Sequence, residues 1–200
     1  MQRNKNNDEA AKGFDTKFVV ATALKLLLIS AVTALLLSGV NALTKDTIAE
    51  NDAKEKSAAI AAIFPDSDSS ESADVTIDGV NGVWLVTSGG DILGYAASVS
   101  PLGFGGALDM MVGVNSDGTI AGMKIVSHSE TPGLGSRVDD PDYLSQYTGK
   151  SGTLSLGNGI DAITGSTISS KAVLEAANRA LSAYSVIFTE NDALIDGGNS

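Results

Sequence analysis

The chain has 200 residues, enough for one domain and an accessory segment, since domains usually run to about 100 to 200 residues. It has no cysteine and one histidine, which excludes thiolate-held iron–sulfur clusters, disulfides and the usual covalent haem and argues against a zinc site, so a redox cofactor would have to be organic. Residues 44–200 hold eight basic and twenty-one acidic residues, a net charge of −13 that disfavours binding to a nucleic acid.

A dense apolar run lies between Phe18 and Leu43, and Lys25 is its one charged residue. A membrane span needs about 20 apolar residues, whereas the apolar core of a signal peptide has about 7 to 15. The run therefore predicts an uncleaved transmembrane helix over residues 18–43, with Lys25 close enough to the N-terminal end to snorkel. A cleaved signal peptide is the alternative, because the residues of Ser38–Ala42 are small.

The charges on either side of the run predict its orientation. Residues 1–17 hold four basic and three acidic residues, whereas the region after the run is strongly acidic. By the positive-inside rule, residues 1–17 lie in the cytoplasm and the larger part of the chain lies outside. We expect a single-pass protein of the cell (inner) membrane with an extracytoplasmic domain.

Residues 44–73 are predicted to link the span to the folded domain. Alanines and isoleucines among charged residues suit a helix from Thr44 to Phe64, which Pro65 ends. The Ser, Asp and Glu cluster Asp66–Ala73 has no apolar pattern and is interpreted as an exposed loop. The predicted organisation is a cytoplasmic N-terminus at 1–17, a transmembrane helix at 18–43, a linker helix and loop at 44–73 and a folded domain at 74–200.

Short apolar runs separated by Gly-rich or Asp-rich turns predict five strands in the folded domain. They cover Val75–Ile77, Gly82–Thr87, Ile92–Val99, Ala107–Asn115 and Ile120–Ser127. The turns are of hairpin type, so the strands are expected to form an antiparallel meander. A short helix is expected near Asp142–Gln146, and helical spacing predicts a last helix from Ser169 or Ser170 to Phe188 that lies on the sheet. The fold class is therefore α+β.

The segment Asp161–Thr167 directly precedes this last helix. Gly165 lets the backbone turn, and Thr167 and Ser169 put hydroxyl groups where the helix has unpaired N–H groups. A phosphate bound there would meet these donors and the positive end of the helix dipole. From residue chemistry alone, the alternative is a helix cap with a turn glycine and no ligand. The segment lacks the Gly-Lys-Ser/Thr ending of a nucleotide P-loop.

Here the sequence resembles the FMN-binding domain family of the G subunit of the Rnf electron-transport complex and the C subunit of sodium-pumping NADH:quinone reductase. The family motif is Asp-x-x-Ser/Thr-Gly-Ala-Thr, which Asp161, Thr164, Gly165 and Thr167 match, with Ser166 in the place of alanine. The resemblance implies that a flavin transferase links FMN to Thr167 through a phosphoester. Thr167 would then be an attachment point and not a catalytic nucleophile.

A second stretch supports the same resemblance. His128-Ser129-Glu130-Thr131-Pro132-Gly133-Leu134-Gly135 is similar to the family's His-x-Glu-Thr-Pro-Gly-Leu-Gly loop, and the upstream Gly103–Gly106, with Phe104 where tyrosine is common, also looks like the family. Pro132 stiffens the loop and its glycines allow close approach, so its N–H groups could bond the ring carbonyls and Leu134 could pack on the ring. Without the resemblance, a rigid surface turn would be the simpler interpretation.

Several side chains near these motifs have two interpretations. His128 is expected to make a structural hydrogen bond that fixes Glu130-Thr131, and Glu130 is either a capping carboxylate or a group near the flavin. Asp139–Asp142 is expected to be a solvated loop and not a metal site. The predicted cofactor-binding residues are Thr167, Thr164, Gly165, Ser166, Ser169, Glu130, Thr131, Pro132, Gly133, Leu134 and Gly135, with no catalytic or metal-binding residue.

The resemblance implies an electron-carrier subunit of a membrane-bound, ion-translocating complex of the Rnf type. Ferredoxin and NAD would be the end partners of the complex, Na⁺ or H⁺ the coupled ion, and other membrane subunits the neighbours of this chain, which would have no independent turnover. The alternatives are the C subunit of sodium-pumping NADH:quinone reductase, a cofactor-free membrane-tethered scaffold module and a lone extracytoplasmic flavin reductase.

Overall fold

A computed structural model describes residues 16–188 of the chain. Its contacts divide the chain into two units, one up to Asn51 and one from Asp52 onward. A single helix, α1 (Thr16–Ile63), begins in the first unit and ends in the second. The two helices predicted over residues 18–43 and 44–64 are therefore parts of one continuous helix, which ends two residues before Pro65.

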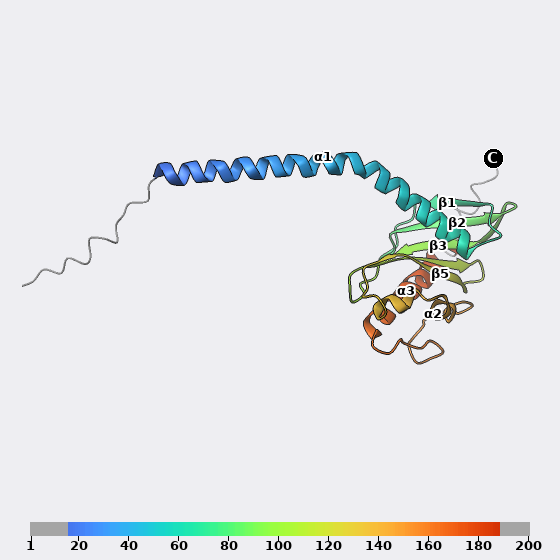
Figure 1. The fold of residues 1–200 in the computed structure, drawn as a ribbon. Helices are drawn as coiled ribbons and strands as arrows, with labels where there is room; N and C mark the ends of the chain where they lie inside the picture. The colour runs from blue at the N-terminus through green and yellow to red at the C-terminus, as the bar shows by residue number, and fades with distance from the viewer. Residues whose placement is uncertain (1–15, 189–200) are drawn as a thin grey trace, which may run out of the picture. The chain divides into compact units, whose positions relative to one another are not determined.

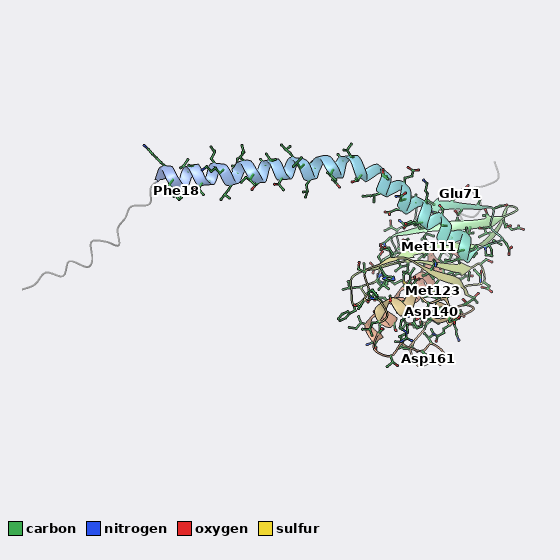
Figure 2. All side chains as sticks on the ribbon, in the orientation of Figure 1. Phe18, Glu71, Met111, Met123, Asp140 and Asp161 are labelled. Carbon is green, nitrogen blue, oxygen red and sulfur yellow. The ribbon has the colours of Figure 1, made fainter. Side chains whose placement is uncertain are left out.

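The first unit consists of the N-terminal part of α1. Its apolar side chains project outward from Phe18 onward (Figure 2), and none of the apolar stretch is buried. An 18-residue stretch of the helix has a mean hydropathy of 2.3, so the helix is long and apolar enough to cross a membrane. An isolated apolar surface of this kind suits lipid and not water.

The second unit is built on a five-stranded sheet (Figure 1). Its strands are β1 (Ser69–Ala73), β2 (Gly82–Ser88), β3 (Asp91–Val99), β4 (Leu108–Asn115) and β5 (Ile120–His128). They pair in the order β1-β2-β3-β4-β5, and every pair is antiparallel. The predicted antiparallel meander and its last four strands are confirmed.

The prediction for the first strand of the sheet is wrong. Ser69–Ala73, interpreted from the sequence as part of an exposed loop, forms β1 and pairs with β2 from Ser69 opposite Thr87 to Ala73 opposite Val83. An edge strand needs only main-chain hydrogen bonds, so its polar side chains carry no apolar pattern. Val75–Ile77, predicted as a strand, lies outside the sheet, and Ile77 packs against the core instead.

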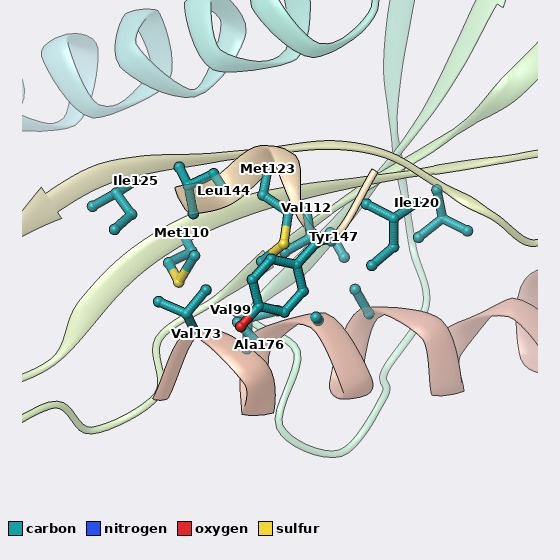
Figure 3. Close-up of a cluster of buried hydrophobic side chains, with 14 of the residues drawn as sticks. Val99, Met110, Val112, Ile120, Met123, Ile125, Leu144, Tyr147, Val173 and Ala176 are labelled. Atoms are coloured by element: carbon teal, nitrogen blue, oxygen red, sulfur yellow. The ribbon is translucent and has the colours of Figure 1, made fainter. Parts of the chain in front are cut away.

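One face of the sheet packs on the last helix, α3 (Thr167–Phe188). Figure 3 shows Met110 and Val112 of β4 with Val173 and Ala176 of the helix, and Tyr147 lies in the same cluster. The buried Tyr95 hydroxyl donates a hydrogen bond of 2.7 Å to the Ala180 carbonyl, and burial raises the pKa of Tyr95. The predicted position of the last helix on the sheet is confirmed.

The other face of the sheet packs on the end of α1. Ala59, Ile60 and Phe64 are buried in a second cluster with Val86, Ala96 and Met111 of the sheet. The side chains of the adjacent residues Met111 and Val112 therefore lie on opposite faces of the sheet and belong to different hydrophobic clusters, as the two-residue period of a strand requires. The packing of α1 and β1 joins residues 52–73 to the same compact unit as the rest of the sheet domain.

The segment between β5 and α3 contains little regular structure. A 3₁₀ turn, η2 (Gly135–Asp139), leads into α2 (Pro141–Ser145), close to the short helix predicted near Asp142–Gln146. The Asp140 side chain caps α2 by accepting a 3.0 Å hydrogen bond from the Asp142 N–H, so this aspartate of the Asp139–Asp142 cluster has a structural role.

Candidate functional site

The turn before α3 brings the Thr167 hydroxyl to the start of a helix. The Ser166 N–H bonds the Ile163 carbonyl at 2.9 Å, and Gly165 has a φ of +83°, as the third residue of a type II turn requires. The helix begins at Thr167, two or three residues before the predicted start, and the Ser170 N–H closes its first turn by donating to the Ser166 carbonyl. The Ser170 hydroxyl accepts a 3.0 Å bond from the Ile163 N–H, which ties the turn to the helix.

The other three hydroxyl groups at this helix start, those of Ser166, Thr167 and Ser169, differ in exposure. Thr167 is exposed, whereas Ser166 and Ser169 are buried. Neither buried hydroxyl has a hydrogen-bond partner among the described residues. Buried polar groups are normally paired, and the first N–H groups of a helix have no acceptor within the helix. The helix start is therefore a set of unused donors around an accessible threonine, an arrangement suited to an anion.

A second loop faces this turn. The N–H groups of Leu134 and Ser136 both donate to the Thr131 carbonyl, at 3.1 and 3.2 Å, and Gly133, between Thr131 and Leu134, has a φ of +74°. Gly165 and Leu134 are adjacent, since a Cβ added to Gly165 would lie 3.6 Å from Leu134 Cδ1. Residues separated by some thirty positions in the sequence thus form one surface.

Glu130 connects this loop to a third segment, the Gly103–Gly106 loop before β4. Its Oε1 accepts hydrogen bonds from the Phe104 N–H at 2.8 Å and from the Gly105 N–H at 3.3 Å. The Glu130 N–H in turn donates to His128 Nδ1 at 3.2 Å, so the structure contains a hydrogen bond of the kind predicted for His128. Glu130 itself is only 5% exposed.

These three segments enclose a cavity of about 260 Å³. Its lining consists of Phe104, Glu130, Thr131, Leu134, Gly135, Gly165, Ser166, Thr167, Ile168 and Ser169. Three of these side chains are large, apolar and largely exposed: Phe104 at 71%, Ile168 at 52% and Leu134 at 48%. The cavity thus has polar groups at the helix start and an apolar rim, which is the usual make-up of a site for an organic cofactor.

Eight of the predicted cofactor-binding residues line this cavity. The other three, Thr164, Pro132 and Gly133, do not line it, because they form the outer corners of the two turns. The structure adds Phe104 and Ile168 to the predicted set. Phe104 lies in the Gly103–Gly106 stretch that resembles the family, but it is not among the residues predicted to bind the cofactor. Ile168 is also missing from that prediction, although an apolar residue directly after Thr167, at a helix start, could have been recognised.

Comparisons with known proteins cover both units of the chain. Residues 16–63 match the family model described as the RnfG N-terminal region, and residues 103–182 match the model described as the FMN-binding domain. The second match contains all the residues that line the cavity.

Two similar proteins match along almost their whole length. The chain is 33% identical over 194 residues to the G subunit of the Na(+)-translocating ferredoxin:NAD(+) oxidoreductase complex of Acetobacterium woodii, a match that covers 85% of this chain and 93% of that relative. It is 32% identical to the G subunit of the ion-translocating oxidoreductase complex of Methanosarcina acetivorans, over 84% of this chain and 95% of the relative. A solved structure, the C subunit of the Na(+)-translocating NADH-quinone reductase from Parabacteroides distasonis, matches at 29% identity and a TM-score of 0.45, over 54% of this chain and 62% of that chain.

Proposed function

Because the chain belongs to the family of G subunits of ion-translocating ferredoxin:NAD(+) oxidoreductase complexes, we propose that it relays electrons through an FMN esterified to Thr167. These two relatives are named as G subunits and match along more than nine-tenths of their length, which favours this assignment over the C subunit of the quinone reductase. The observation that carries the proposal is the accessible Thr167 hydroxyl at the edge of the cavity, beside two buried hydroxyl groups without partners among the described residues.

The residues at the start of α3 fit the phosphate group of FMN. Ser166 and Ser169 offer two hydroxyls that have no partner within the described part of the chain, and the first turn of the helix offers N–H groups and the positive end of its dipole. Thr167 is exposed, so an enzyme that attaches the cofactor can reach its hydroxyl. The hydroxyl groups, the N–H groups and the helix dipole would each stabilise the negative charge of the phosphate. They would take the place of Lys and Arg, which are absent from the residues that line the cavity.

The apolar rim fits the ring of the cofactor. Phe104, Leu134 and Ile168 come from three different segments and expose apolar surface at one cavity, where a flat ring would cover them. When bound, FMN supplies a ring that takes up and releases electrons. The chain's own residues would hold that ring, limit its contact with water and set its distance from the redox centres of other subunits.

The remaining features of the proposal concern the membrane. α1 would anchor the chain as a single-pass helix, with the flavin domain on the extracytoplasmic side in accordance with the charges that flank the span. The partners would be the other membrane subunits of the complex, and a flavin transferase would be required for maturation. Ferredoxin and NAD would react at other subunits.

The first experiment is the intact mass of the full chain purified from membranes. We expect an increment equal to one esterified FMN on the native chain and on Thr167→Ser, and none on Thr167→Ala, because only the first two carry a hydroxyl at this position. Thr153→Ala removes an exposed threonine that lies outside the cavity and is the matched control, which should keep the increment.

Two results would contradict this proposal. A native chain without the increment, made in cells whose transferase modifies another protein, would favour the cofactor-free scaffold module. An FMN-bearing chain that fails to co-purify with integral membrane subunits in mild detergent would favour the lone reductase.

A further inference from the structure

Glu130 is a buried carboxylate whose two oxygens have different surroundings. Oε1 accepts two backbone N–H groups, and Oε2 is buried without a hydrogen-bond partner among the described residues. We propose that Glu130 is a positioning residue of the flavin site, which holds two walls of the cavity through Oε1 and accepts a hydrogen bond from the bound flavin through Oε2. This inference rests on the proposed function.

The first role follows from the contacts of Oε1. This oxygen lies within hydrogen-bonding distance of the Phe104 and Gly105 N–H groups, so it holds the loop that carries Phe104 against the segment that carries Leu134. Hydrogen bonds to a charged acceptor are stronger than bonds between neutral groups. Main-chain hydrogen bonds such as Gly103 N–H to the Gly106 carbonyl close the loop itself. Phe104 is 71% exposed, so burial of its side chain does little to hold the loop against the Leu134 segment, and the two bonds to the carboxylate make that connection.

Two glycines make room for this carboxylate. A Cβ added to Gly103 would overlap Glu130 Oε1 and, equally, Leu108 Cδ1, and a Cβ added to Gly135 would overlap Glu130 Oε2. Neither glycine has a positive φ, so backbone conformation does not require glycine at either position. What both positions have in common is the space that the Glu130 side chain occupies between the two loops.

The second role follows from the state of Oε2. A buried carboxylate oxygen without a donor is costly, and the residues that line the cavity include no cation that could offset it. Glu130 is the one ionisable side chain in that lining. A bound molecule with an N–H or O–H group could therefore donate the hydrogen bond that Glu130 Oε2 lacks within the described residues.

The flavin offers donors of the required kind on its uncharged parts, namely the imide N–H of the ring and the hydroxyls of the ribityl chain. Its phosphate group is negative and would repel the carboxylate, whereas the start of α3 attracts it. Glu130 therefore faces the ring or the ribityl chain. Its negative charge makes the addition of an electron to the ring less favourable and so lowers the reduction potential of the flavin.

The test of the second role is the reduction potential of the FMN-bearing full chain in Glu130→Gln. Gln keeps an oxygen for the Phe104 loop and removes the charge. We expect the potential to become more positive, so that at a fixed solution potential the ratio of reduced to oxidised flavin rises by roughly tenfold or more. The control is Glu71→Gln, which removes the same charge from the exposed edge strand β1 (Figure 2) and should leave the potential unchanged. Equal potentials in the two variants would overturn this role.

The first role can be tested without flavin, in chains that also carry Thr167→Ala. Hydrogen exchange of the Phe104 and Gly105 amides should be slow when Glu130 is present, remain slow in Glu130→Gln and become fast in Glu130→Ala. Unchanged exchange in Glu130→Ala would overturn the role of Oε1. Failure of the proposed function would instead be seen in the intact-mass measurement, as the absence of FMN from the native chain.

Discussion

The positive φ of Gly165 is the backbone feature on which the position of Thr167 depends. The turn from Ile163 to Ser166 closes through one hydrogen bond, and α3 begins at the next residue. A residue with a Cβ rarely adopts this conformation, whatever the free space around it. In the proposed attachment site, Gly165 would therefore act through its backbone conformation and Thr167 through its hydroxyl.

Gly165→Ala should reduce FMN attachment and lower stability. A Cβ at this position meets only Leu134 Cδ1 at 3.6 Å, an ordinary contact, so the cost of about 1 kcal/mol comes from the backbone. Gly149→Ala is the matched control, because Gly149 has a φ of +74° and free space around it but lies outside the cavity. Intact mass and thermal unfolding should show similar losses of stability and a loss of FMN only for Gly165→Ala. Full FMN attachment in Gly165→Ala would contradict the role of the turn.

A second residue, Asp117, gives the turn between β4 and β5 a dependence on pH. The Thr119 hydroxyl and N–H donate to Asp117 Oδ1 at 2.7 and 2.9 Å, and these bonds, the side-chain one first, hold the pKa of Asp117 below its ordinary value of 3.8. A carboxyl with a lowered pKa in the folded state contributes stability above its unfolded pKa and loses it as the pH falls through its folded pKa.

Asp117→Asn should therefore have a lower free energy of unfolding than the native chain near pH 7. This difference between the two chains should become smaller as the pH falls below 3.8. The measurement is urea unfolding between about pH 2 and pH 7, followed by the fluorescence of Trp84, the single tryptophan of the chain. Asp91→Asn, on an exposed carboxyl at the start of β3, is the control and should show no such narrowing. A difference for Asp117→Asn that stays constant over this range would contradict the contribution of the Thr119 bonds.

At the scale of elements, the packing of the end of α1 on the sheet depends on glycines. Gly113 of β4 lies opposite Gly122 of β5, and Ile63 lies against both. A Cβ at Gly113 would overlap Ile63 and the Phe64 ring, whereas a Cβ at Gly122 would lie 3.5 Å from Ile63, an ordinary contact. The two glycines look alike in sequence, but only one is required by the helix.

Gly113→Ala should destabilise the sheet domain by about 1 to 3 kcal/mol, because the end of α1 has to move away from β4. Gly122→Ala, on the neighbouring strand, should cost much less. Urea unfolding of the two variants measures the difference. Equal costs would show that the packing of Ile63 and Phe64 does not depend on the free space over Gly113.

At the scale of the whole molecule, α1 belongs to both units. Its N-terminal part is exposed, apolar and long enough for a membrane, whereas Ala59 and Ile60 are core residues of the sheet domain. The helix therefore has two different functions along its length, and the division falls near Asn51.

A chain that begins at Asp52 should fold and leave the membrane fraction, whereas a chain that begins at Asp66 should be much less stable. The longer chain keeps Ala59, Ile60 and Phe64, which cover Val86 and Met111; the shorter one exposes this face of the sheet to water. Fractionation and thermal unfolding distinguish the two. Equal stability would show that the end of α1 is not part of the core.

Much of this organisation could be predicted from local sequence patterns. The apolar run of α1, the hairpin turns of β2–β5 and the helical spacing of α3 each depend on neighbours in the chain, so their periods are visible in sequence. β1 could not be predicted in this way. This edge strand of Ser and Glu is held by main-chain hydrogen bonds to β2, and a pattern of side chains does not reveal such bonds.

The candidate site also has a part that the sequence predicts and a part that only the tertiary structure decides. The turn glycine and the hydroxyls before α3 could be identified in sequence, because a helix start is a local feature. Only the tertiary structure brings the Phe104 loop and the Leu134 loop together, buries Ser166 and Ser169 and joins the loops through Glu130. The physical reason is that a cavity and a hydrogen bond between distant segments depend on how the chain packs in three dimensions, and no local period of the sequence records that packing.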